Sequence, residues 1–412
     1  MKHDVFELSI NELQEIGTDL QSKIADGLQQ DGEEIACLPT YITPGGELEG
    51  KVLALDWGGT NFRAAIVLFE KGKKPVIMEN LKKPLSCKET EGFSQEDLWN
   101  EMALLIGQLK DLDRSVTHIG YCFSYPAEST LNGDAILLRW TKEINIPDMV
   151  NKLVGKPLME YLNRHDSIRS KTQFTTVKVV NDTIACLFAG LAQPGYDSYI
   201  GLIVGTGTNM AGLIHKAKIS KLNKDYNGGN YIPVNLESGN LQPKHLTVID
   251  ERVDKNSREP GKQMFEKAIS GGYLGAIFRH TYPDLTIESK FDGEKLSNLL
   301  NFPDIYKDEF VYVARSIYAR SAELVAASLA GLILILVDYQ DKNTFDKSIT
   351  DICLAADGSL FWSVDQNGKD YHVLVKKALE SILDSFGLGN IYIHINQLDD
   401  ANLTGAAIAT LS

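Results

Sequence analysis

The sequence predicts a mixed α/β protein, because strand patterns alternate with helical patterns along both halves of the chain. The main observation is a glycine turn between two apolar runs, which occurs once in each half. The two segments read VLALDWGGTNFRAAIVL at residues 52–68 and SYIGLIVGTGTNMAGLI at residues 198–214. Both contain Gly-Thr-Asn at the turn, and this weak internal repeat predicts two similar strand-turn-strand units.

The first element along the chain is an amphipathic helix near the N-terminus. Leu13, Ile16, Leu20, Ile24 and Leu28 recur at three- and four-residue spacing, while the residues between them are acidic or polar. One apolar face of this kind favours a helix that packs on a core, rather than one that anchors in a membrane.

The middle of the chain continues the alternation. Residues 93–112 predict a helix with Ser94 as its N-cap, and helical patterns recur near residues 148–163. TTVKVVN, ending at Asn181, predicts a strand, and residues 184–195 predict the helix that follows it.

The last third is mainly helical up to about residue 340. Residues 311–337 predict one long helix or two, and the apolar run at 325–337 is too short to span a bilayer, so we expect it to be buried. Residues 350–362 predict a strand that enters an Asp-Gly turn. The segment NLTGAAIATLS places Thr404 and Gly405 before a short helix.

Composition narrows the class of protein. The chain has 412 residues, enough for two domains, and 43% are hydrophobic, which is typical of a globular protein. The formal charge of −14 argues against a nucleic-acid partner. Five scattered cysteines without a CxxC motif indicate reduced thiols, and MKHDVFELSI lacks the apolar core of a signal peptide. We therefore expect a cytoplasmic protein with no membrane partner, either a monomer or a homodimer.

The glycine turn at residues 56–61 is more polar than a hairpin requires, since one Asn-Gly pair would suffice. Glycine allows a ligand to approach the backbone closely, and turns of this kind present N–H groups that bind phosphate. The turn is therefore a candidate phosphate site, with an ordinary hairpin as the alternative.

Six segments resemble the eukaryotic-type hexokinase family, and they occur in the family's order over roughly residues 38–410. They read LPTYITPGGELEGKVLALDWGGTNFR, FSYPAES followed by LLRWTKEI, VVNDTIA, GLIVGTGTN, EPGKQMFEKAISGGYLG and LAADGSLFW. One such motif would be weak evidence, but six in order are specific.

The resemblance implies the two-domain actin-like ATPase fold, which is ribonuclease H-like, with a cleft between the domains. It implies a small domain of residues 41–183 plus 403–412 and a large domain of residues 1–40 plus 184–402. It also implies transfer of the γ-phosphoryl group of ATP to the 6-hydroxyl of a hexose, most simply glucose, with Mg²⁺, as in the first step of glycolysis.

The family's site residues carry over to matching positions here. Asp182 would be the catalytic base and Lys142 would stabilise charge near the transferred phosphoryl group. The sugar-binding positions are Ser124, Thr141, Lys142, Asn181, Asp182, Asn209, Glu237 and Glu266. The positions for ATP are Asp56, Gly58, Gly59, Thr60, Asn61, Arg63, Gly205, Thr206, Gly207, Gly358 and Ser359, of which Asp56 would hold Mg²⁺ through water.

Some of these residues also have plainer interpretations. Taken alone, Asn181-Asp182 resembles a helix N-cap, and the capping and catalytic roles can hold at once. Glu266 could belong to a solvated helix face, and Asp357-Gly358 could be a simple turn. Arg63, two residues beyond Asn61 on the same side of a strand, could pair with Asp56 or with phosphate.

The chain departs from the family at three places. Ser238 follows Glu237 where the family usually has Trp, and Glu143-Ile144 replaces a common Gly-Phe; both changes leave sugar selectivity open. Trp57 stands where an aliphatic residue is usual, and no role for it follows from the sequence.

Proteins of other classes must also be considered. A sugar sensor on the same fold could have lost catalysis, but Asp56, Lys142 and Asp182 are all present. A bacterial-type sugar kinase or repressor commonly carries a zinc motif, and the five Cys and eight His here show no metal-ligand spacing.

Overall fold

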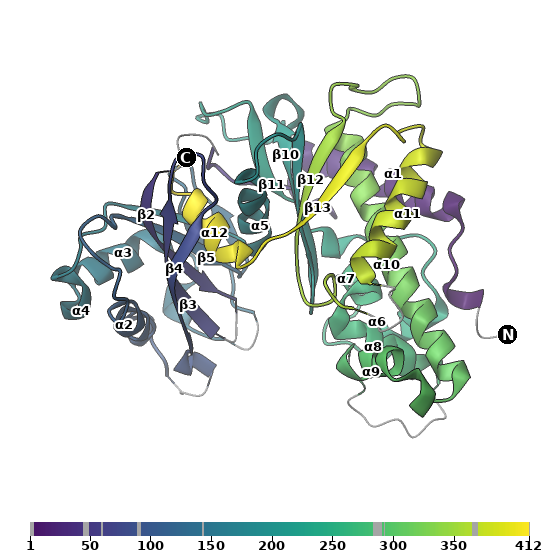
Figure 1. Ribbon diagram of the computed structural model, residues 1–412, viewed down its shortest axis with the longest axis horizontal. Coiled ribbons are helices and arrows are strands. Elements are labelled where there is room, and N and C mark those ends of the chain that lie inside the picture. Colours follow the sequence, from purple (N-terminus) through teal and green to yellow (C-terminus); the bar gives the residue numbers. More distant parts are fainter. Residues whose placement is uncertain are drawn as a thin grey trace.

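The computed structural model describes residues 4–43, 49–58, 61–88, 92–141, 144–282, 291, 293–364 and 370–411. They form two lobes, each built on one large sheet (Figure 1). The first sheet has the order β4-β3-β2-β5-β8, with strands Val76–Pro84, Asn61–Phe69, Gly50–Trp57, His118–Phe123 and Thr176–Val180. A separate ribbon pairs β6 (Ala127–Ser129) with β7 (Ala135–Leu137).

The second sheet repeats the plan of the first. Its order is β1-β11-β10-β9-β12-β13, with strands Leu38–Pro39, Tyr231–Asn235, Thr208–His215, Ser198–Val204, Asp351–Asp357 and Tyr392–Gln397. In each sheet an antiparallel hairpin (β2–β3 or β9–β10) is extended by two parallel strands (β5 and β8, or β12 and β13). The internal repeat and the mixed α/β class expected from the sequence are confirmed.

Helices cover the outer faces of both sheets. The first lobe carries α2 (Gln95–Ile106), α3 (Gly155–Arg164) and α4 (Asp166–Arg169). The second lobe carries α1, α6–α9 and α11, whose bounds are Ile10–Gln29, Val248–Lys255, Met264–Ile269, Gly271–Thr281, Gly293–Asn301 and Tyr371–Ser385. Ser94 caps α2 as expected, although that helix ends at Ile106 instead of near residue 112.

Two helices join the lobes. The helix α5 (Asp182–Leu191) packs on β9 and on α12 (Ala401–Ile408), which comes from the end of the chain and lies with the first lobe in Figure 1. Ile184, Phe188 and Leu403 share one buried cluster with strand residues of both sheets. Because α5 begins where β8 ends, it carries the predicted base Asp182 to the junction of the lobes.

The expectation that Thr404 and Gly405 precede the last helix is wrong. Both lie inside α12, which begins after Asp400. The backbone of Asp400 is left-handed, with φ of 50°, and Leu403 and Thr404 donate their N–H groups to its carbonyl oxygen. The proposed domain boundaries at residues 41, 183 and 403 stay a prediction.

The apolar run near the centre of the second lobe belongs to a single helix, α10 (Asp308–Leu336). It is long and apolar enough to cross a membrane by length and composition, but 89% of its most apolar window is buried inside the protein. It packs against α1 and α11, so it serves as the core helix of this lobe. All five cysteines are buried and free.

Residues near the N-terminus pack against α10 beside a buried ion pair. The ring of Phe6 lies 4.9 Å from the guanidinium of Arg320, which in turn makes two 2.7 Å bonds to Asp250. Beside them, burial raises the pKa of Glu323 to about 7, with repulsion from Glu7 adding to the rise and Arg320 opposing it. The folded protein therefore favours the protonated, neutral form of the Glu323 carboxyl group.

We expect Glu323→Gln to stabilise the protein most at neutral and alkaline pH. The folded pKa of about 7 exceeds the ordinary 4.5, so wild-type stability is fully present below pH 4.5 and falls as the pH rises to about 7. The variant should melt about 1–3 °C higher than the wild type at pH 8, with a smaller gain at pH 5. Calorimetry checks this, and Glu160→Gln on exposed α3 is the control; equal gains at both pH values would contradict the expectation.

Candidate active site

The first cluster of predicted residues lies at the end of the β2–β3 hairpin. The register places Asp56 directly opposite Arg63, whose Nε and Nη2 atoms donate to Asp56 Oδ2 at 2.8 and 2.5 Å. Arg63 Nη1 also donates to Asp400 Oδ1 at 2.5 Å, at the start of α12. Of the two partners the sequence left open for Arg63, the structure shows Asp56.

Asp56 is a buried carboxylate with one oxygen unused. Its side chain sits among strand ends, and the residue is 6% exposed. Burial raises its pKa, the charge of Arg63 opposes that rise, and repulsion from Asp182 adds to it. Within the part of the chain that the structure describes, Asp56 Oδ1 accepts no hydrogen bond. A buried carboxylate oxygen that lacks a donor suits a hard cation or the water bound to one, so the residue fits a Mg²⁺ site.

Asp182 is the first residue of α5, and its neighbour Asn181 is the cap. Asn181 Oδ1 accepts from the N–H groups of Thr183 and Ile184 at 2.8 and 3.1 Å. Asp182 Oδ1 accepts from Asn181 Nδ2 at 3.0 Å and from Thr183 N at 2.9 Å. The capping role therefore belongs to Asn181, and this leaves Asp182 held by one carboxylate oxygen at the mouth of the helix.

The second cluster lies in the other lobe, where β10 and β11 face each other. Asn209 Nδ2 donates to Asn235 Oδ1 at 2.7 Å, and Asn235 Nδ2 donates to Glu237 Oε1 at 2.7 Å. Glu237 has a left-handed backbone, with φ of 59°, at the start of a short 3₁₀ turn. Burial raises the pKa of Glu237, hydrogen bonding by Asn235 lowers it, and repulsion from Asp182 raises it further.

Strand register locates these groups relative to one another, because Asp56 pairs with Cys122 and Cys122 pairs with Val180, two residues before Asp182. Repulsion from Asp182 acts on Asp56, which belongs to the first sheet, and also on Glu237, which belongs to the second lobe. Asp182 therefore lies near Asp56 of the first sheet and near Glu237 of the second lobe, where the lobes meet. A small cavity of 40 Å³ lined by Asn181 and Asn235 lies at the same junction.

Glu266, on α7, is tied to the β9–β10 turn. Its Oε2 atom accepts from Thr208 N at 3.1 Å. A Cβ atom on Gly207 would lie 2.6 Å from that same oxygen, so only glycine lets the carboxylate approach. The side chain is partly buried rather than lying on a solvated helix face, and it joins the sugar-binding cluster to the phosphate turn.

The predicted nucleotide residues of the second lobe also come together. Gly205 accepts a hydrogen bond from Gly271 N at 2.8 Å, at the start of α8, and Thr206 accepts from Gly272 N at 3.3 Å. Gly358 has φ of 115°, and a Cβ atom there would lie 2.3 Å from the carbonyl oxygen of Val204. The Asp-Gly turn that carries Ser359 therefore lies directly against the 205–207 turn.

The remaining predicted residues of the first lobe lie on neighbouring strand ends. Ser124 N donates to the carbonyl oxygen of Trp57 at 3.1 Å, and a Cβ atom on Gly58 would lie 3.5 Å from Ser124 Oγ. Asn61 begins β3, and Thr141 follows Trp140 in a loop. Gly59, Thr60, Lys142 and Glu143 fall outside the described residues, so their predicted roles or effects stay predictions.

Two residues of the site escaped sequence reasoning. Asn235, 5% exposed, holds both Asn209 and Glu237, and its position two residues before the predicted sugar acid Glu237, at the end of β11, was the available signal. Asp400 holds Arg63 from 337 positions away, and no local pattern marks it.

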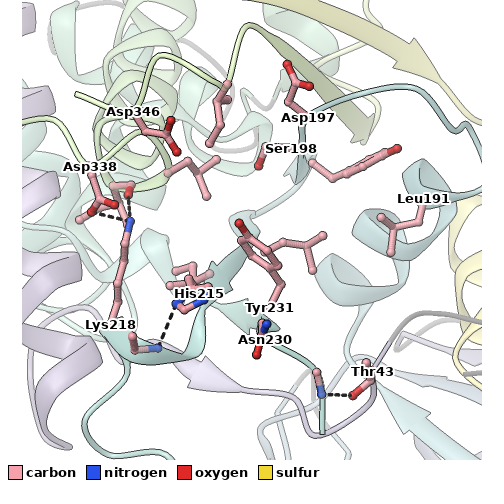
Figure 2. A pocket seen from close by; sticks show the side chains of 18 of the residues that line it. Thr43, Leu191, Asp197, Ser198, His215, Lys218, Asn230, Tyr231, Asp338 and Asp346 are labelled. Atoms are coloured by element: carbon pink, nitrogen blue, oxygen red, sulfur yellow. Dashed lines mark hydrogen bonds and ion pairs between the residues drawn. The ribbon is translucent and has the colours of Figure 1, made fainter.

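A cavity of 840 Å³ lies elsewhere, beside the start of β9 and the end of β10 (Figure 2). Leu191, Asp197, His215, Lys218 and Asp338 are among its lining residues. None of the predicted site residues lines it, so the chemistry is assigned to the junction of the carboxylates and not to this larger space.

Both family models and individual proteins match this chain. Two models described as hexokinase match this chain, one over residues 3–191 and the other over residues 199–311 and 293–412. Hexokinase-3 of Rattus norvegicus is 31% identical over 317 residues, which cover 74% of this chain and 33% of that protein. Hexokinase-9 of Oryza sativa subsp. japonica is 25% identical and covers 97% of this chain and 86% of that protein. The chain thus spans about a third of the length of the rat protein.

A solved structure, the hexokinase from Schistosoma mansoni complexed with glucose, matches with a TM-score of 0.76 at 25% identity. The match covers 99% of this chain and 96% of that one. The two-domain actin-like ATPase fold expected from the sequence is confirmed by this match. Together with the family models, which cover most of the sequence, it shows that the chain belongs to the hexokinase family.

Proposed function

We propose that this protein is an ATP-dependent hexokinase, which transfers the γ-phosphoryl group of ATP to the 6-hydroxyl of glucose or a related hexose. The observation that carries the proposal is the meeting of Asp182, Asp56 and Glu237 at the junction of the lobes. The proposed base is thereby within electrostatic reach of both a carboxylate suited to a metal ion and a sugar-binding acid.

The sugar would be held mainly by the second lobe. Asn209, Glu237 and Glu266 offer amide and carboxylate groups, which match the several hydroxyls of a hexose. The Schistosoma mansoni relative was solved with glucose, and this supports glucose as the first sugar to test. Ser124, Thr141 and Asn181 would meet the same sugar from the first lobe, so binding would draw the lobes together.

Asp182 would accept the proton of the 6-hydroxyl as that oxygen attacks phosphorus. Asn181 and Thr183 hold its Oδ1 atom, which fixes the orientation of the carboxylate. Orientation of this kind supplies much of the catalysis of phosphoryl transfer, because the protein mainly positions the groups and offsets charge. Lys142 would add positive charge beside the transferred group.

The phosphates of ATP would lie between the two glycine turns. The backbone N–H groups of Gly58 to Asn61 would meet them from the first lobe and the turn of Gly205, Thr206 and Gly207 from the second, with Gly358 and Ser359 beside the nucleoside. Within that second turn Gly205 N already donates to the carbonyl oxygen of Gly207 at 2.9 Å, so the N–H groups of Thr206 and Gly207 are the candidate donors. Asp56 would hold Mg²⁺ through its free Oδ1 atom, directly or through water. When bound, Mg²⁺ supplies charge that offsets the negative triphosphate.

The setting of the enzyme is also part of the proposal. Five buried, free cysteines fit a reducing compartment, which supports a cytoplasmic location. Phosphorylation of a hexose there would be the first step of glycolysis. A monomer or a homodimer remains the expectation for the assembly.

A panel of hexoses with Mg-ATP, followed by a coupled assay of ADP release, tests the function. We expect turnover of glucose or a closely related hexose. Calorimetric binding of a sugar without any phosphorylation would instead identify a sugar sensor, and neither binding nor turnover of any hexose would overturn both.

A further inference from the structure

Trp57 lies at the centre of an aromatic cluster beneath the predicted sugar site. Leu53, Leu55 and Trp57 alternate along β2, so they face the core of the first lobe, while Asp56 faces the other way. Trp57 is 1% exposed. An aliphatic side chain such as that of Leu53 or Leu55 would also fill a buried position on this face of β2. The much larger indole of Trp57 therefore needs an explanation.

The indole touches rings from two other segments. The centroids of Tyr125 and Trp140 lie 5.0 and 5.5 Å from that of Trp57, and Phe123 lies at 5.9 Å. Tyr125 and Trp140 also meet edge to face at 5.0 Å. Edge-on and tilted contacts at these distances are favourable between aromatic rings and hold them in defined orientations.

Each segment of the cluster carries a residue of the site. Gly58 follows Trp57, Ser124 lies between Phe123 and Tyr125, and Thr141 follows Trp140. Backbone and indole bonds support the arrangement: Ser124 N donates to the carbonyl oxygen of Trp57 at 3.1 Å. Trp140 Nε1 donates to the carbonyl oxygen of Ile146 at 2.7 Å and ties down the segment that carries Thr141.

We propose that Trp57 is a positioning residue for the sugar, because its indole sets the relative placement of Ser124 and Thr141. The inference rests on the proposed function, since it takes these two residues as sugar contacts. Without the indole, Tyr125 and Trp140 would shift into the vacated volume, and the two polar side chains would move with them. Small displacements of binding groups carry large penalties in affinity and rate.

Trp57→Leu tests the proposal, since leucine matches Leu53 and Leu55 on the same face of β2. We expect the Kd of glucose, measured by calorimetry without ATP, to rise about tenfold, and the KM of glucose to rise with it. The KM of ATP should rise less than that of glucose, because the second lobe supplies half of the ATP site. Trp57→Phe, which keeps an aromatic ring, should restore most of the glucose affinity.

The control is Trp99→Leu, which removes an indole from the same core. Trp99, on α2, is partly buried against this core and contacts Tyr161 of α3 at 5.6 Å between ring centroids. It should lower the melting temperature as Trp57→Leu does, yet leave the Kd of glucose unchanged. If Trp57→Leu does not fold, Trp57→Met allows the same comparison with a more adaptable side chain.

The outcomes separate the two claims. A glucose Kd within twofold of wild type in the Trp57 variant, despite a lower melting temperature, would reduce Trp57 to a packing residue and overturn the inference. If the wild type binds glucose without phosphorylating it, the proposed activity fails while the Kd comparison still decides the role of Trp57. If the wild type binds no hexose, both proposals fall.

Discussion

Asp182→Asn should reduce kcat by about 10²–10⁴-fold, the range expected when a general base is removed. The asparagine has the same size and keeps an oxygen for the N–H group of Thr183, so the start of α5 should be preserved. Glucose binding should persist, because asparagine keeps a carbonyl oxygen for a sugar hydroxyl and loss of the Asp182 charge removes one cause of the raised pKa of Glu237.

Asp308→Asn is the matched control for this change. Asp308 is likewise the first residue of a helix, α10, but it is exposed and has no predicted role in the site. Both substitutions remove a negative charge from a helix N-terminus, which costs about 0.3–1 kcal/mol of stability. Only Asp182→Asn should impair the coupled assay, and a kcat within tenfold of wild type would exclude Asp182 as the base.

Asn235→Leu should weaken glucose binding about 10–100-fold. The substitution leaves Glu237 Oε1 with the 3.5 Å contact to Asn209 and removes the 2.7 Å bond from Asn235. It also removes the acceptor of Asn209 Nδ2. Leaving a buried polar atom unpaired costs about 1–3 kcal/mol, and each 1.4 kcal/mol is a tenfold change in Kd.

The same substitution should change the pH dependence of binding. The hydrogen bond from Asn235 lowers the pKa of Glu237, so its loss raises that pKa further above the ordinary value. If the ionised form accepts hydrogen bonds from the sugar, affinity in the variant should begin to fall at a higher pH than in the wild type as the solution is acidified.

Calorimetric titration with glucose across a pH series measures both effects of Asn235→Leu. Asn396→Leu is the control, because Asn396 also lies in a strand of the second sheet, β13, and donates to Cys353 outside the site. Unchanged affinity in Asn235→Leu would show that Glu237 does not depend on this support.

Local patterns were sufficient for much of the fold. Alternation and apolar runs located the strands around the two glycine turns, and the three- and four-residue spacing located α1. The start of the last helix was predicted wrongly. The helix α12 begins at Ala401, before Thr404 and Gly405, after Asp400 adopts a left-handed backbone conformation that the local sequence does not signal.

By itself, the sequence determined the family, the repeated glycine turn and the candidate roles of Asp56, Asp182 and Glu237, because motif order and turn chemistry are local properties of the chain. Only the tertiary structure decided that Arg63 pairs with both Asp56 and Asp400, that Asn235 holds Glu237, and that Trp57 packs against Tyr125. These contacts depend on strand register and on side-chain packing between distant segments. No spacing in the sequence encodes which partner a buried ring or charge will meet.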